Sequence, residues 1–97
     1  MATKKLSEIW IQADAELKQT TGSLYRTSEN SYCALGAVGK IALGNPNAPG
    51  AGNMTYDGLQ AFDDALRAKY GCGIITLNDS RGWPFRRFAQ EAERMGF

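Results

Sequence analysis

The sequence predicts a mainly α-helical protein, a compact bundle of about four helices that leaves room for a short two-stranded β element. Three observations lead to this prediction. Apolar residues recur every three or four positions in several segments of the 97-residue chain. Glycines stand where these segments end, and a proline opens the last of them. The sequence contains no repeats and no long linker, so we expect residues 1–97 to form a single globular domain.

The first predicted helix runs from Lys5 to Thr20. Charged and amide side chains take one side of it, and an apolar stripe takes the other. Thr3 and Ser7 are alternative N-caps. We interpret Trp10, in the middle of the stripe, as a core anchor. The stripe consists of Leu6, Ile9, Trp10, Ala13 and Leu17.

Two further helices are expected in the middle of the chain. Residues 32–43 are apolar nearly all round and end at Gly44, which predicts a buried helix capped by Asn30 or Ser31. Residues 45–54 are rich in Pro, Gly and Asn and predict a loop. Thr55 then has the chemistry to cap a third helix, with Asp57 in its first turn. Its buried face is Leu59, Phe62, Leu66 and Tyr70, and Gly71 ends it.

The C-terminal part of the chain is predicted to contain a turn and a closing helix. Residues 72–77 fit either a short buried strand or a helical turn; their β-branched side chains favour the strand, for which residues 23–26 offer a partner. Residues 78–82 form a polar turn, and a helix begins at Trp83-Pro84. The expected buried stripe of this helix is Phe85, Phe88, Ala89, Ala92 and Met95.

Composition and charge exclude several functional classes. Eleven Lys and Arg residues against ten Asp and Glu give a net charge of +1, so we do not expect binding to nucleic acid or to an anionic membrane. No apolar run approaches the roughly 20 residues that span a bilayer. Cys33 and Cys72 are too few for a disulfide scaffold or a metal site, and the chain has no histidine. We expect reduced thiols and a cytoplasmic protein without metal or cofactor.

No motif predicts catalysis. Cys33 lies near a helix N-terminus, where the helix dipole lowers the pKa of a thiol, but the sequence offers no histidine as its general base. We therefore interpret Cys33 as a small apolar residue. Asp63 and Asp64 are adjacent on a helix and point in different directions, which excludes an acid/base pair. We expect no catalytic residues.

Six residues around the last turn are the candidate binding site: Asn78, Asp79, Arg81, Trp83, Arg86 and Arg87. Asn78 and Asp79 have two interpretations, as caps of the closing helix or as acceptors for a ligand or partner. Arginines interleaved with an exposed tryptophan suit a protein interface or a phosphate-bearing ligand. The alternative is a solvated helix face, with Arg87 paired to Glu91 four residues on.

Two short motifs resemble a group of small bacteriophage and prophage proteins. In that group a C-x-L-G segment begins a helix, here Cys33-Ala34-Leu35-Gly36, and an N-D turn precedes a closing helix, here Asn78-Asp79. This chain departs from the pattern by having residues 81–84 before Phe85. The resemblance implies a phage setting and no assigned activity.

We therefore carry two functional hypotheses. The first is a phage-encoded, anti-CRISPR-like inhibitor that binds a protein of a bacterial defence or regulatory complex in the host cytoplasm. The alternative is a protein that sequesters a nucleotide signal, using Asp79, the arginines and a groove at Gly36 and Gly39. A homodimer is compatible with either hypothesis.

Overall fold

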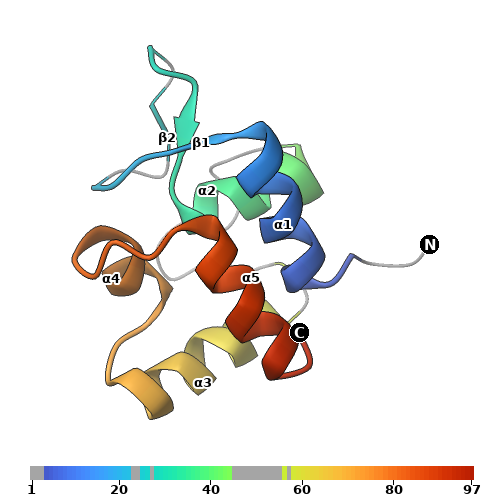
Figure 1. Ribbon diagram of the computed structural model, residues 1–97, viewed down its shortest axis with the longest axis vertical. Helices are drawn as coiled ribbons and strands as arrows, with labels where there is room; N and C mark the ends of the chain where they lie inside the picture. Colours follow the sequence, from blue (N-terminus) through green and yellow to red (C-terminus); the bar gives the residue numbers. More distant parts are fainter. Residues whose placement is uncertain (1–3, 23–24, 27, 45–55, 57) are drawn as a thin grey trace.

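The computed structural model describes residues 4–22, 25–26, 28–44, 56 and 58–97. Helices account for most of these residues, and a small sheet lies at one side (Figure 1). The predicted mainly helical fold is confirmed. No helix in the described part of the chain is both long enough and apolar enough to cross a membrane. The predicted loop at 45–54, the caps Thr3 and Thr55, and Asp57 lie outside the described residues.

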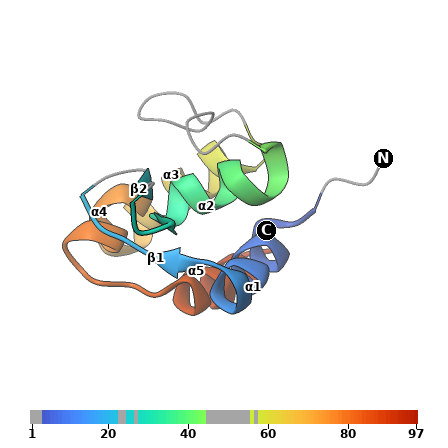
Figure 2. The same cartoon turned by 90° about the horizontal axis from the view of Figure 1, so that it is seen from above.

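Five helices pack around one core in the described ranges. Figure 2 shows α1 and α5 together on one side of the molecule, with α2 and α3 on the other. The start of α1 lies beside the end of α5, where the Ser7 backbone N–H donates to the Phe97 carbonyl at 3.5 Å. The two helices therefore run antiparallel. The helices are α1 Leu6–Glu16, α2 Ala34–Val38 continued by the π-helical η1 Gly39–Leu43, α3 Leu59–Tyr70, α4 Ile74–Asp79 and α5 Phe85–Arg94.

The β element contains three strands of two residues each among the described residues. They are β1 Lys18–Gln19, β2 Tyr25–Arg26 and β3 Ser31–Tyr32. In the order β1-β3-β2, β3 pairs in parallel with β1 and antiparallel with β2. The first helix is shorter than predicted, because the backbone of Lys18–Gln19 leaves the helix to pair with β3.

A continuous row of aromatic rings forms the centre of the core. Trp10 is fully buried, and its indole N–H donates to the Ala34 carbonyl at 3.0 Å, which confirms its predicted role as a core anchor. Neighbouring rings lie 5.0–5.5 Å apart between centroids, in tilted or edge-on arrangements that aromatic pairs prefer. In order, the row is Tyr70, Trp83, Phe88, Trp10, Phe62 and Phe97.

Residues 74–79 form a helix, so the strand favoured for 72–77 is wrong, as is its pairing with residues 23–26. Ile74, Leu77 and Asn78 are buried, whereas Ile75 and Thr76 between them are exposed. This spacing of three and four is helical. Asn78 and Asp79 therefore belong to the last turn of α4 instead of a separate polar turn.

The predicted helix ends at Gly44 and Gly71 are confirmed, but the predicted caps that lie among the described residues, Ser7 and Asn30 or Ser31, are not the caps observed. Gly44 and Gly71 adopt the left-handed conformation, with φ of 70° and 79°. At the starts, Ser7 lies inside α1, and Cys33 caps α2 in place of Asn30 or Ser31. At the starts of α2, α4 and α5, side chains from distant elements accept the first backbone N–H of the helix.

Candidate binding surface

Asn78 is a buried hydrogen-bonding hub. Its side-chain oxygen accepts from the Ala34 backbone N–H at 3.1 Å and from Gln19 Nε2 at 2.7 Å. Its side-chain nitrogen donates to the Thr20 carbonyl at 3.0 Å and to Asp79 Oδ1 at 2.8 Å. Through its bond to Ala34, Asn78 caps the start of α2. Because its side chain is only 1% exposed, Asn78 cannot contact a binding partner. The structural interpretation of this residue holds, although the helix it caps is α2 and not the closing helix.

Gln19 performs the capping role that was predicted for the turn before α5. Its side-chain oxygen accepts from the N–H of Phe85, the first residue of α5, at 2.9 Å. Its side-chain nitrogen donates to the Trp83 carbonyl at 2.7 Å as well as to Asn78. The backbone on both sides of Pro84 is thus fixed by a side chain that lies 66 residues away from Phe85 in the sequence. Nothing in the local sequence of α5 indicates this partner.

The C-x-L-G and N-D segments contact each other. The Cys33 sulfur accepts from the Gly36 N–H at 3.4 Å, and Asn78 accepts from the Ala34 N–H between them. Together the two segments close the N-terminus of α2, where helix N–H groups lack partners within the helix. Both segments therefore have a structural role in this fold.

Cys33 lies in surroundings that favour the neutral thiol. Burial raises the pKa of the Cys33 thiol above its ordinary value of 9.0, and the nearby Asp79 carboxylate raises it further, against smaller opposing contributions from backbone N–H groups. Because the thiolate is the nucleophile, a raised pKa makes this cysteine a poor one at neutral pH. The N–H groups at the helix end do lower the pKa of the thiol as expected, but burial outweighs them.

Trp83 is buried, which corrects the expectation of an exposed tryptophan at the centre of the site. Its side chain is 7% exposed. Tyr70 meets its ring edge-on at 5.0 Å between centroids, and Phe88 packs on it at 5.3 Å. The sequence could not show which way this side chain points, because Trp83 precedes the helix whose periodicity would place it. Trp83 is a support for the surface and not a part of it.

Arg87 lies directly on this buried ring. The central guanidinium carbon is 4.4 Å from the Trp83 ring centroid, which is the geometry of a cation–π contact. The side chain is exposed and has no carboxylate within 4.0 Å among the residues that the structure describes. The predicted pairing of Arg87 with Glu91 is therefore wrong.

Two other exposed candidates precede Arg87 in the chain: Asp79 ends α4, and Arg81 follows in the turn. Arg81 lies in the α4–α5 turn, where its backbone N–H bonds the Thr76 carbonyl at 3.2 Å; the N–H of Trp83 bonds the Leu77 carbonyl at 3.0 Å. Both contacts fold the turn back onto α4. We call Asp79, Arg81 and Arg87, together with the Trp83 ring beneath Arg87, the arginine corner. Arg86 points instead toward α1, where it lies 3.5 Å from Asp14.

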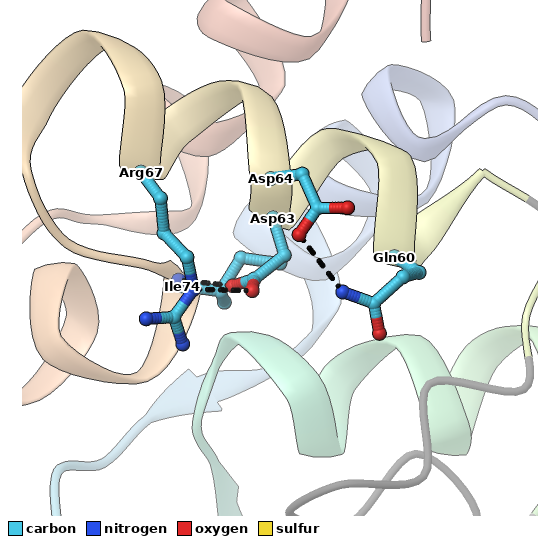
Figure 3. A network of polar contacts seen from close by, with 5 residues as sticks. All are labelled: Gln60, Asp63, Asp64, Arg67 and Ile74. Atoms are coloured by element: carbon cyan, nitrogen blue, oxygen red, sulfur yellow. Dashed lines mark hydrogen bonds and ion pairs between the residues drawn. The ribbon is translucent and has the colours of Figure 1, made fainter.

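Two buried carboxylates that sequence reasoning did not select are used inside the fold. Asp63 accepts from the Ile74 N–H at 2.8 Å and from Arg67 Nε at 2.9 Å, so it caps α4 (Figure 3). Asp64 turns away and accepts from Gln60 at 3.0 Å, which confirms that the two aspartates point in different directions.

Glu91, the second buried carboxylate, has two cationic partners. Its oxygens bind Lys69 at 3.2 Å and Arg94 at 3.1 Å. Burial by itself raises the pKa of Glu91, but hydrogen bonds from Lys69 and Tyr70 and the charges of Lys69 and Arg94 outweigh it and lower the pKa below 4.5. Its position three residues after Phe88, beside Ala92, was the available sequence signal that it lies on the buried side.

Comparison of the chain with protein-family models, curated proteins and solved structures finds no match. Within the described residues, no three Cys, Asp or Glu side chains lie close enough together to share a metal ion.

Proposed function

We propose that this chain is a non-enzymatic binding protein that acts by protein–protein contact through the arginine corner. The observation that supports this most strongly is the state of Arg87: it is exposed, it is held on a buried aromatic ring, and it has no ion-pair partner among the described residues. Arginine is among the residues that contribute most to interface binding energy. A guanidinium that is already positioned loses less conformational freedom on binding.

The rigid setting of the corner supports the same function. Gln19 fixes the backbone at Trp83 and Phe85, and Asn78 joins this bonding to the start of α2. Arg81 thus lies on a braced turn, and Arg87 lies in the first turn of α5, directly after it. Such a surface can be presented to a partner without rearrangement.

The resemblance to small phage and prophage proteins suggests the setting of this interaction. It suggests a partner in a bacterial host, because small phage proteins without catalytic groups commonly disable host machinery. We therefore propose a protein of a bacterial defence or regulatory complex as the partner, in the host cytoplasm.

A quantitative pull-down tests the proposal. Tagged wild type, Arg81→Ala/Arg87→Ala and the control Arg26→Ala/Lys40→Ala are incubated with bacterial host lysate. Both double variants remove two exposed positive charges, and the control residues lie on β2 and η1. We expect wild type and control to recover the same partner and the corner variant to lose it. Equal recovery by all three, or no specific recovery by wild type, would contradict the proposal.

A further inference from the structure

From the proposed contact function, we infer that the arginine corner takes a carboxylate-bearing segment of a protein, an Asp or Glu side chain held in a forked contact with Arg87. Arg81 contributes a second contact. Three features support this: Arg87 lies over the Trp83 ring, Asp79 is exposed at the end of α4, and the first N–H groups of α2, α4 and α5 are already bonded.

The stacked position of Arg87 leaves its hydrogen-bond donors available. A guanidinium in contact with an aromatic ring through its face keeps its N–H donors around the edge. No side-chain hydrogen bond of Arg87 exists among the described residues; only its backbone N–H is used, by the Pro84 carbonyl at 2.9 Å. A planar fork with free donors matches the two oxygens of a carboxylate.

Asp79 makes the corner a poor site for a polyanion. Its exposed carboxylate accepts from the Asn78 side chain at 2.8 Å and remains at the end of α4, next to the turn that carries Arg81. A nucleotide or a nucleic acid would bring several negative charges against this carboxylate. A protein segment brings single carboxylates at spaced positions, and it can offer a donor to Asp79.

The starts of the nearby helices are also occupied. Helix N-termini bind phosphate through free backbone N–H groups. In this fold the first N–H of α2, of α4 and of α5 is bonded by Asn78, Asp63 and Gln19 respectively. The first backbone N–H of each of these helices is therefore not available to a phosphate.

The test is an NMR titration of the full chain with defined probes. The side-chain Nε–Hε signals of Arg81 and Arg87 and the indole N–H of Trp83 are followed. The probes are a blocked decapeptide of alternating Glu and Ala, the same peptide with Gln in place of Glu, inorganic phosphate, and ATP. Arg87→Lys, which keeps the charge but not the fork, and Lys40→Ala are titrated alongside.

We expect the Glu peptide to shift the Arg81, Arg87 and Trp83 signals, and the Gln peptide, phosphate and ATP to leave them in place at equal concentration. In Arg87→Lys the apparent dissociation constant of the Glu peptide, read from Arg81 and Trp83, should rise about tenfold, because a forked charge-assisted contact is lost. Lys40→Ala should match wild type.

Three results would overturn the inference: no shift with the Glu peptide, equal binding by Arg87→Lys, or tighter binding of phosphate or ATP at the same signals. The pull-down separates the two proposals. A partner lost only in the corner variant, together with a silent Glu peptide, would remove the carboxylate inference and leave the contact function. If the Glu peptide binds but no partner is captured, carboxylate binding by the corner stands and the proposed contact function is removed.

Discussion

The Asn78 side chain at the end of α4 accepts a hydrogen bond of 3.1 Å from the backbone N–H of Ala34, the first residue of α2. With its three other bonds, Asn78 joins α2, α4 and the chain that leads out of β1. This buried amide explains why the turn before α5 has a fixed shape. The same bonding explains why a residue that looked like part of a binding site belongs to the interior.

Replacing Asn78 by Ala should destabilise the fold by about 2–3 kcal/mol, because several buried polar groups lose their partner at once. The free energy of unfolding in urea measures this. Ser80→Ala is the matched control: Ser80 is exposed two residues on, and a change within about 0.5 kcal/mol is expected. A similar small effect for Asn78→Ala would show that the hub carries little of the stability.

Gly73→Ala should destabilise the fold by about 1–3 kcal/mol through overpacking. A Cβ at this position would collide with Asp63 Oδ1 and lie 3.0 Å from two guanidinium nitrogens of Arg67. The effect should shrink in an Asp63→Ala background, since the colliding carboxylate is gone. A double-mutant cycle on the free energy of unfolding tests this coupling. Strict additivity of the two changes would refute the close approach.

Glu91 should make stability depend on pH in the acid range. Its pKa is lowered in the folded protein, so its ionised form stabilises the fold above about pH 4.5. This contribution is lost as the pH falls through the lowered folded value. In Glu91→Gln, the slope of unfolding free energy against pH should be reduced in that window. Glu93→Gln, at an exposed neighbouring position, should keep the wild-type slope. Equal slopes in the two variants would contradict a stabilising role for ionised Glu91.

Ser31→Ala should be neutral or stabilising by up to about 1 kcal/mol. The Ser31 hydroxyl is buried, and it has no hydrogen-bond partner among the residues that the structure describes. Removing an unpaired buried polar group relieves its desolvation cost. Thermal and urea unfolding measure the change. A clear loss of stability would mean that the hydroxyl has a partner after all.

Sequence reasoning succeeded where a helix carries its own signal. The apolar stripes of α1, α3 and α5 and the glycines at 44 and 71 were sufficient to predict the main helices. Prediction from the sequence failed where a residue far away in the chain determines the local structure. Ile74, Ile75 and Thr76 are β-branched, yet they lie in a helix whose first N–H is capped by Asp63.

The candidate site was predicted in part for the same reason. Asp79, Arg81, Arg86 and Arg87 are exposed as expected, although Arg86 faces Asp14 on α1. Asn78 and Trp83 are buried because Gln19, Tyr70 and Phe88 hold them there. None of these three contacts is visible in the sequence around the turn.

The most direct test of the arginine corner is the affinity of the captured partner, once purified, for wild type and single variants. Isothermal titration calorimetry should show Arg87→Ala weakening the complex by about thirtyfold or more, as at an interface hot spot. Lys40→Ala should change the dissociation constant less than about twofold, as expected away from the interface. An Arg87→Ala variant that binds as tightly as wild type would contradict the account.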